Sequence, residues 1–414
     1  MKILLSAYAC EPNKGSEPGV GWNWALALVR RGHEIWVITR KNNQTTIEQE
    51  LVRLGEPYIS QLHFIYYDLP QWALRWKKGG RGVHLYYALW QRGILRVARD
   101  AHLTHHFDVA HHLTFGVWRQ PTQLYKLGIP YIFGPVGGGE STPWALVPSM
   151  PGIRSRISEY LRYAVNGLSL FNPSLRACLK QTHWVISKTH ETAAWVAKAG
   201  AKSLVSLEIG ISPERISSSQ SESRPAKLRC LYAGRLIALK GVHLALAAVA
   251  EVHYKGVDIS FTIIGNGPLI DYFKEKVDLF GISEQVTFMG QLNQADLFVQ
   301  YLEHDLLLFP SLHDSSGNVV LESFANGLPV LCLNLGGPGE MVDDTCGRTV
   351  EAKGVGHEVV ISRLAEALHE FASAPELMQK FREGARAKAI ASSWDVVVSR
   401  VYAHLPLEDG NLTI

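Results

Sequence analysis

A chain of 414 residues is longer than a single hydrophobic core usually serves, so the length predicts two domains. Hydrophobic residues make up 47% of the chain and charged residues 19%, which excludes an intrinsically disordered protein. The net charge of +3 is too small for a dedicated nucleic-acid binder, so we expect no nucleic acid among its partners.

The five cysteines are scattered and include no CxxC pair, which indicates neither a disulfide framework nor a zinc ribbon. A reducing compartment fits this usage. The opening MKILLSAYACEP is shorter than a signal peptide requires and is predicted to be a first strand. No apolar run reaches the roughly 18 residues of a membrane-spanning helix. We therefore expect a cytoplasmic protein, with the inner face of the plasma membrane as one location within that compartment.

The first residues have the pattern of a strand, a loop with glycines, a helix and a second strand. KILLSAY is an apolar run typical of a buried parallel strand, and the helix is predicted at residues 22–31. The loop between them contains Gly15, Gly19 and Gly21. Glycines before a helix allow a phosphate to approach backbone N–H groups closely, so Gly19 and Gly21 are candidate binding residues. A tight turn without a ligand is the alternative.

Aromatic and basic residues alternate in two segments, residues 71–99 and 153–176. Trp and Tyr beside Arg and Lys are typical of a surface that meets an anionic membrane. The alternative is a pair of solvated helix faces whose aromatic residues belong to the core.

A strand predicted at residues 109–111 ends in His111 and His112, and a later strand ends in a glycine loop that includes Gly137 and Gly138. In open α/β sheets ligands collect at the carboxyl ends of strands, so these four residues are candidates. Histidine can donate to a sugar hydroxyl or act as a base near neutral pH.

A polar run at residues 211–227, rich in Ser, Glu and Pro, indicates a linker at a domain boundary. We expect an N-terminal domain at residues 1–210, a C-terminal domain at residues 211–393 and a final helical segment at residues 394–414.

The second domain begins with the strand LRCLYAG, which places Arg235 at its end, and Lys240 follows just before a helix. Two cations beside a helix N-terminus can bind a diphosphate, because charged donors and the helix dipole act together. Solvated surface residues are the alternative. The turn after the strand ISFTIIG contains Gly265 and Gly267.

The stretch FPSLHDSSGNVVLESFANGLPVLCLNLGGPGE, residues 309–340, is predicted to be a strand end, a polar turn, a helix and a further strand. Glu322 falls in the first turns of that helix. A carboxylate there can accept the two hydroxyls of a ribose while backbone N–H groups face a phosphate. An ordinary strand-turn-helix crossover is the alternative.

These loops, in this order, resemble the retaining glycosyltransferases of family four. The matching pieces are PGVGWNWALALVRRGHEIWVIT, AGRLIALKG, IIGNGP, FPS with the acidic turn, VVLESFANGLPVL and LGGPGEMV. The resemblance implies the α/β GT-B fold, in which two Rossmann-like domains face each other across a cleft and a C-terminal helix crosses back to the first domain. It implies that residues 1–210 form the acceptor-side domain, that residues 211–393 form the nucleotide-sugar-binding domain, and that residues 394–414 form the crossover helix that packs on the first domain.

The resemblance also implies roles for particular residues. Arg235 and Lys240 match the pair that binds the donor diphosphate and stabilises it as the leaving group. Glu322 matches the second glutamate of the E-x7-E signature, the ribose ligand. Asp314 occupies the first position and is one methylene shorter than the usual Glu, so Ser315 or Ser316 is expected to share its contact with the donor sugar.

The family's HxH after a first-domain strand becomes His111-His112-Leu113 here, which leaves its sugar-contacting role open between the two histidines. The candidate catalytic residues are Arg235, Lys240, Asp314, Glu322, His111 and His112. The candidate substrate-binding residues are Gly19, Gly21, Gly137, Gly138, Gly265, Gly267, Ser315, Ser316, Gly317, Asn318 and Val319.

The expected function is transfer of a sugar, with retained configuration, from a nucleotide-sugar donor to a hydroxyl of an acceptor glycan. A lipid-linked acceptor in bacterial exopolysaccharide or lipopolysaccharide biosynthesis is expected, with peripheral contact to an anionic membrane. No cofactor and no obligatory metal are expected. The alternatives are a nucleotide-sugar epimerase, a phosphorylase on the same fold, and a non-catalytic nucleotide-sugar-binding protein.

Overall fold

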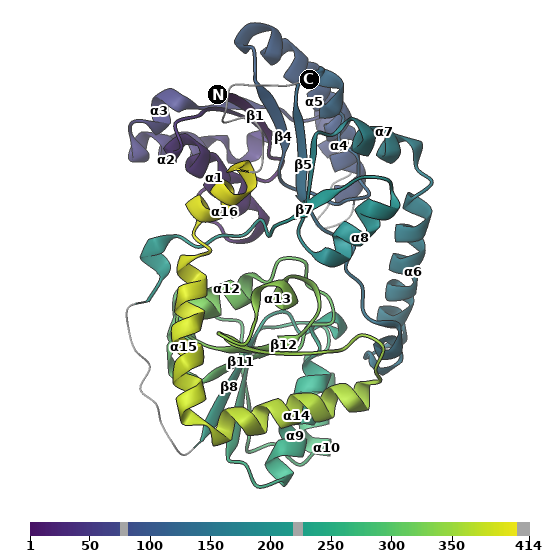
Figure 1. Cartoon of the computed structure of the whole chain (residues 1–414), viewed down its shortest axis with the longest axis vertical. Coiled ribbons are helices and arrows are strands. Elements are labelled where there is room, and N and C mark those ends of the chain that lie inside the picture. Colours follow the sequence, from purple (N-terminus) through teal and green to yellow (C-terminus); the bar gives the residue numbers. More distant parts are fainter. Residues whose placement is uncertain (75–81, 218–226, 404–414) are drawn as a thin grey trace. The chain divides into compact units, whose positions relative to one another are not determined.

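A computed structural model describes residues 1–74, 82–217 and 227–403 of the chain (Figure 1). The remaining residues belong to the predicted aromatic-basic segment at 71–99, to the predicted linker and to the end of the predicted crossover helix, and these parts of the predictions lie outside the described residues. Internal contacts divide the chain into two units. Unit 1 comprises residues 1–139, 166–209 and the chain from residue 394, and unit 2 comprises residues 140–165 and 210–393.

Unit 1 contains a seven-stranded parallel sheet in the order β3-β2-β1-β4-β5-β6-β7. Its strands are β1 (Lys2–Ser6), β2 (Glu34–Thr39), β3 (Leu62–Tyr66), β4 (Val109–His112), β5 (Tyr131–Val136), β6 (Trp184–Ser187) and β7 (Ser203–Val205). The order reverses between β1 and β4, which lie side by side although they are far apart in the chain. Such a reversal is where open α/β sheets bind ligands.

The described helices of unit 1 are α1 (Ser16–Arg30), α2 (Gln44–Leu54), α3 (Tyr58–Gln61), α4 (Gln71–Leu74), α5 (Val83–His105), α7 (Pro173–Gln181), α8 (His190–Lys198) and α16 (Trp394–Ala403). Helix α1 carries the run VGWNWALALV and is buried on nearly all sides, because a helix that is apolar all round must be covered. Helix α16 covers it: Asp395 pairs with Arg30 at 2.7 Å, and the Tyr402 hydroxyl lies 2.8 Å from His111 Nδ1. In its described residues, the last helix thus groups with unit 1.

Helix α5 contains much of the segment 71–99, for which the sequence predicted either a membrane-facing surface or aromatic residues in the core. Tyr86, Tyr87 and Trp90 are buried in the core of unit 1, whereas Arg92 and Arg96 are exposed. The helix therefore presents arginines to solvent without the aromatic residues that a membrane-facing surface would need. The alternative interpretation, aromatic residues in the core, holds for these positions.

Unit 2 contains a six-stranded parallel sheet in the order β10-β9-β8-β11-β12-β13. Its strands are β8 (Leu228–Ala233), β9 (Ile259–Ile264), β10 (Val286–Gly290), β11 (Leu306–Phe309), β12 (Val330–Leu333) and β13 (Gly347–Val350). The central strands β11 and β12 are apolar and buried at every position, as expected for a sheet covered on both faces. The order reverses between β8 and β11, which makes this the second switch point of the chain.

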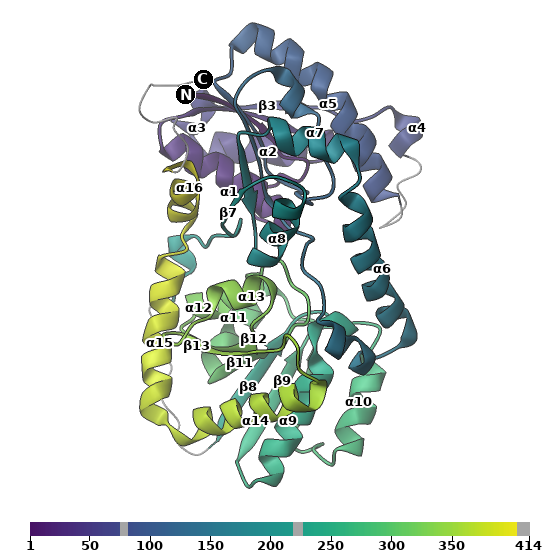
Figure 2. The same cartoon turned by 45° about the vertical axis from the view of Figure 1, so that its right-hand side comes forward.

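The described helices of unit 2 are α9 (Val242–Tyr254), α10 (Ile270–Leu279), α11 (Gln294–Glu303), α12 (Asn318–Ala325), α13 (Gly336–Met341), α14 (His357–Ser373) and α15 (Pro375–Ile390). Helix α14 packs against α9, and α12 packs against α15 (Figure 2). Helix α6 (Ile153–Ser169) begins in unit 2 and ends in unit 1.

Residues 140–165 differ from the expected division, which assigned them to the first domain. They group with unit 2, because this segment has its own side-chain contacts there: the short helix η3 (Trp144–Ser149) packs against α14, and Glu140 lies beside His313. The composition of residues 140–165 does not predict that they group with unit 2. Among the described residues, no helix is both long and apolar enough to cross a bilayer.

An ion cluster at the start of β11 joins β8, β11 and α15. Asp305 accepts two hydrogen bonds of 2.8 Å from the Arg229 guanidinium, one of 3.1 Å from Arg229 N and one of 2.9 Å from Arg382. The side chains of Asp305 and Arg382 are only 8% and 4% exposed. Burial lowers the pKa of Arg382 although Asp305 opposes that shift. Removing the one carboxylate would leave a buried guanidinium without its counter-charge.

We therefore expect Asp305→Asn to lower the free energy of unfolding by about 3–5 kcal/mol, measured by urea denaturation at pH 7. Glu251→Gln is the matched control, because Glu251 pairs with Lys255 on the surface, where the loss of an ion pair costs at most about 1 kcal/mol. Equal stability losses in the two variants would show that the buried cluster is not what holds β11 in place.

Candidate functional site

The switch point of unit 2 gathers most of the residues that the sequence singled out. Arg235 and Lys240 follow β8, Gly265 and Gly267 follow β9, and the loop from residue 310 to 317 follows β11. Because β8, β9 and β11 are parallel neighbours, these loops meet at one edge of the sheet. The structure thus brings the predicted cations and the predicted acidic turn to the same place.

Lys240 joins the two central loops. It ends the short helix η5 (Ala238–Lys240), and its Nζ lies 2.5 Å from Asp314 Oδ2. Both side chains are less than one-fifth exposed, at 18% and 19%. Lys240 Nζ also lies 5.4 Å from the centroid of the Phe309 ring. Arg235, in contrast, is exposed, and its backbone carbonyl accepts a 3.0 Å hydrogen bond from the Tyr232 hydroxyl.

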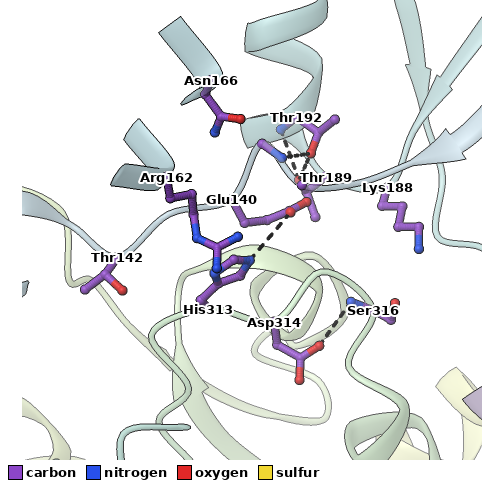
Figure 3. A network of polar contacts seen from close by, with 12 residues as sticks. Glu140, Thr142, Arg162, Asn166, Lys188, Thr189, Thr192, His313, Asp314 and Ser316 are labelled. Carbon is purple, nitrogen blue, oxygen red and sulfur yellow. Dashed lines mark hydrogen bonds and ion pairs between the residues drawn. The ribbon is translucent and has the colours of Figure 1, made fainter. Parts of the chain in front are cut away.

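Asp314 also shapes the turn that begins α12. Its Oδ1 accepts a 3.1 Å hydrogen bond from Ser316 N (Figure 3) and a 3.0 Å hydrogen bond from Gly317 N. Gly317, in the left-handed conformation with φ 73°, is the N-cap of α12. Burial alone would raise the pKa of Asp314, but the Lys240 ammonium and these two N–H donors outweigh it, and the pKa lies below its ordinary value.

Three further predicted residues lie at or just before the start of α12. Ser315 is half-buried, and Asn318 and Val319 are the first two residues of the helix. The N–H groups of a first helical turn have no partner within the helix and carry the positive end of its dipole. These positions therefore present hydrogen-bond donors beside the Lys240 ammonium.

Glu322 lies further along α12. Its Oε2 accepts a 3.2 Å hydrogen bond from the Tyr301 hydroxyl of α11. Burial raises the pKa of Glu322, and the Tyr301 hydroxyl and Arg215 offset only part of that effect. The side chain is thus a desolvated carboxylate whose charge would be stabilised by further hydroxyl donors.

The predicted glycines after β9 have a structural explanation. A Cβ at Gly265, where φ is +133°, would lie 1.9 Å from the carbonyl oxygen of Gly234, and one at Gly267 would lie 2.4 Å from that of Leu236. The loops after β8 and β9 therefore touch backbone to backbone. Close loop packing requires these glycines whether or not a ligand approaches them.

A polar cluster before Asp314 was not predicted. His313 Nε2 lies 4.0 Å from Glu140 Oε2, and Figure 3 shows Arg162 of α6 directed toward the same imidazole. Glu159, which is fully buried, accepts a 3.0 Å hydrogen bond from Arg162. Burial lowers the pKa of His313 to about 4, and the Arg162 charge adds to this effect. In the sequence, the only sign of this cluster is that His313 follows a strand, where open α/β sheets bind ligands.

At the switch point of unit 1, the predicted glycine loop differs from what was expected. Gly19 and Gly21 lie inside α1, which begins at Ser16 and not at residue 22. A Cβ at Gly19 would lie 2.1 Å from the Lys14 carbonyl oxygen, and one at Gly21 would lie 2.3 Å from that of Ala9. Their lack of side chains lets the preceding loop fold against the first turns of the helix.

His111 and His112 point to opposite faces of β4. His111 Nε2 lies 2.6 Å from the Gly134 carbonyl oxygen, and its Nδ1 lies 2.8 Å from the Tyr402 hydroxyl, so both ring nitrogens are engaged. His112 Nε2 lies 3.0 Å from the Tyr87 hydroxyl, while its buried Nδ1 has no hydrogen-bond partner among the described residues. Burial lowers the pKa of His112 to about 3, so the ring is neutral at pH 7.

Charged residues that the sequence did not single out lie near these strand ends. Lys188, directly after β6, pairs with Glu208 at 2.6 Å, and both side chains are buried, at 7% and 4% exposure. Glu17, in the first turn of α1, accepts a 3.1 Å hydrogen bond from Phe115 N. Burial raises the pKa of Glu17, and the Lys188 charge opposes this. Lys188 follows a strand and could have been found by that rule, whereas nothing in the sequence marks Glu208.

The glycine loop after β5 belongs to unit 1. Gly137 donates a 2.9 Å hydrogen bond to the Gly116 carbonyl, and the Gly138 carbonyl accepts one of 2.7 Å from Arg119. The loop is thus tied to the chain that follows β4. Within the described ranges, no group of three or more His, Cys, Asp or Glu side chains is placed to hold a metal ion.

Comparisons with known proteins match the part of the chain that contains the unit 2 site. Residues 214–388 match the family model described as glycosyl transferases group 1. The chain is 25% identical over 186 residues to an alpha-D-kanosaminyltransferase from Streptomyces kanamyceticus, a match that covers 42% of this chain and 47% of that protein. The chain thus spans about half the length of the curated relatives it matches.

Solved structures resemble the chain over nearly its whole length. A sucrose-phosphate synthase from Thermosynechococcus elongatus aligns with a TM-score of 0.64 at 15% identity, covering 97% of both chains. HepE of Anabaena, solved in complex with UDP, aligns with a TM-score of 0.59 at 14% identity and covers 97% of this chain and 99% of its own. With two parallel-sheet α/β units, this similarity shows the GT-B fold, as the sequence predicted.

The pKa of Glu322 leads to a pH-dependent stability prediction. Because its folded-state pKa is raised, its ionised form costs stability; the cost is absent below the unfolded-state pKa of about 4.3 and complete above the folded-state pKa. Glu322→Gln keeps an acceptor for the Tyr301 hydroxyl without the charge. We expect its stability relative to the native chain to increase as the pH rises from about 4 to 7, measured by urea denaturation. A difference that does not change with pH would contradict the assigned burial.

Proposed function

We propose that the chain is a glycosyltransferase that moves a sugar from a nucleotide-sugar donor to a hydroxyl of an acceptor, with retained anomeric configuration. The observation that carries this proposal is the arrangement in unit 2, where Lys240, the N-terminus of α12 and Glu322 occupy one switch point within the group 1 domain. The likeness to HepE, a protein solved with UDP, supports a nucleotide-sugar donor.

The diphosphate would bind between the two central loops. Lys240, Arg235 and the N–H groups of Asn318 and Val319 supply positive charge and donors on one side of the site. A bound diphosphate would compete with Asp314 for the Lys240 ammonium, since the two anionic groups cannot share one cation without repulsion. Glu322, already desolvated, would accept the ribose hydroxyls in addition to the Tyr301 hydroxyl.

In the proposed reaction, the bond between the anomeric carbon and the diphosphate oxygen breaks as the acceptor oxygen attacks from the same face. The acceptor proton passes to the departing phosphate oxygen, so charge and atoms balance. Lys240 and Arg235 stabilise the negative charge that develops on the diphosphate, which is the role a metal ion has in other transferases. We propose on this basis that the reaction needs no obligatory metal and no cofactor.

In unit 1, His112 is the better candidate of the two histidines for contact with the sugar. Both nitrogens of His111 bind protein groups, and its ring supports the packing of α16 on β4. The neutral His112 ring keeps one nitrogen without a protein partner among the described residues, as a hydroxyl ligand would require.

A lipid-linked acceptor, in bacterial exopolysaccharide or lipopolysaccharide synthesis, is the acceptor class we propose. Helix α6 exposes an apolar stripe at helical spacing, whose members are 42–70% exposed: Ile153, Ile157, Tyr160, Leu161, Val165 and Leu168. Exposed arginines occur at both ends of this region, Arg154 in α6 and Arg176 in the next helix, α7. An apolar face with basic neighbours fits the surface of an anionic membrane on the cytoplasmic side.

The donor site is tested by Arg235→Ala, assayed for sugar transfer and for donor hydrolysis with a panel of nucleoside diphosphate sugars. We expect turnover to fall roughly a hundredfold, because one charged donor to the leaving group is lost, while the fold is unchanged. Lys255→Ala is the matched control and should keep full activity, because Lys255 is an exposed cation at the C-terminal end of α9, away from the strand ends. Full activity of Arg235→Ala would contradict the proposed site.

The same assay separates the alternative functions. Activity that depends on inorganic phosphate would indicate a phosphorylase, and conversion of the donor into an epimer would indicate an epimerase. Tight binding of a nucleotide sugar without any turnover would indicate a non-catalytic binding protein.

Membrane contact is tested by co-sedimentation with vesicles that contain phosphatidylglycerol. We expect the double variant Ile157→Asp/Leu161→Asp to lower the bound fraction on the order of tenfold, because it removes apolar contact and adds negative charge. Leu279→Asp, at an exposed leucine of α10, is the control. Binding that is equal in the two variants, or that does not depend on the anionic lipid, would remove the membrane from the proposal.

A further inference from the structure

The polar cluster around His313 contains hydrogen-bonding capacity that the protein itself does not use. His313 directly precedes Asp314, and its side chain is 11% exposed. Its Nδ1 is buried and has no hydrogen-bond partner among the described residues, and its Nε2 lies 4.0 Å from Glu140 Oε2, too far for a hydrogen bond. A buried polar atom without a partner is costly unless a ligand satisfies it.

We propose that His313 and Glu140 form the part of the donor site that recognises the hydroxyl groups of the transferred sugar. This inference rests on the proposed glycosyl transfer. His313 would contact the sugar directly. Glu140 would accept a hydrogen bond from a sugar hydroxyl or from the imidazole N–H of His313.

The charge state of the cluster favours a neutral ligand over a phosphate. Burial and Arg162 lower the pKa of His313 to about 4, so the ring is neutral at pH 7 and has one donor and one acceptor nitrogen. By formal charge, Glu140 and Glu159 carry two negative charges against the one positive charge of Arg162. A phosphate would be repelled by this excess, whereas a sugar hydroxyl, which both donates and accepts, matches it.

The segment that supplies Glu140 is joined to helix α6 by contacts of its own. Glu159 accepts a 3.1 Å hydrogen bond from Thr142 N, and the Tyr163 hydroxyl donates a 2.7 Å hydrogen bond to the Thr142 carbonyl. The rings of Trp144 and Tyr163 stack with centroids 4.2 Å apart. These contacts position the chain two residues beyond Glu140, which is itself 1% exposed.

The position of the cluster relative to the proposed diphosphate site fits this role. Asp314 connects the two, because its carboxylate pairs with Lys240 on the phosphate side while its backbone is joined to His313. Glu140, Glu159 and Arg162 lie outside residues 214–388, the matched domain. The sugar selectivity of this chain would therefore depend on a segment that lies outside that domain.

The test compares the affinities of paired ligands, UDP with UDP-glucose, ADP with ADP-glucose and GDP with GDP-mannose, by isothermal titration calorimetry. The native chain first identifies the pair that binds. For that pair, we expect His313→Ala and Glu140→Gln to weaken binding of the nucleotide sugar roughly tenfold and to leave binding of the nucleoside diphosphate within about twofold. His313→Gln, which keeps a neutral donor and acceptor, should recover part of the loss.

His357→Ala, at an exposed histidine of α14, is the matched control and should change neither affinity. Equal weakening of the diphosphate and the nucleotide sugar, with a lowered melting temperature, would assign His313 a purely structural role and overturn the inference. Unchanged binding of the sugar conjugate in both variants would overturn it while leaving the proposed transfer intact. Absence of binding to every diphosphate and conjugate by the native chain would overturn the proposed function and this inference together.

Discussion

The ion pair between Lys240 and Asp314 is the contact on which the unit 2 site depends. It joins the loop after β8 to the loop after β11 at the point where the strand order reverses. The second oxygen of the same carboxylate holds the turn that begins α12. One aspartate thus places a cation and a helix N-terminus side by side.

The surroundings of that pair divide the site by charge. On one side lie cations and backbone donors, which favour phosphate groups. On the other side lie a neutral imidazole and an excess of carboxylates, which favour hydroxyl groups. A nucleotide sugar has the same division, because its diphosphate is anionic and its sugar is neutral. The arrangement of charges, more than any single residue, links the geometry to the proposed donor.

The sequence predicted the fold and the strand ends of unit 2 because both depend on local patterns. Apolar runs of strand length, each followed by glycines or charged residues, locate the strand ends, and Lys240 and Glu322 were singled out in this way. Contacts between distant segments could not be predicted: Glu140 reaches His313 across more than 170 positions, and His111 packs against Tyr402 of the last helix. For a related reason, the sequence did not decide whether the aromatic residues of α5 face a membrane or the core, since composition does not reveal which face of a helix is covered.

A crystal structure of the full chain with a bound nucleoside diphosphate would test the central claim most directly. We expect the diphosphate oxygens within hydrogen-bonding distance of Lys240 Nζ and of the N–H groups at the start of α12, with the ribose hydroxyls on Glu322. The Lys240–Asp314 pair would be lengthened or broken in that complex. A diphosphate bound away from the β8–β11 switch point, with the pair intact, would contradict the assignment.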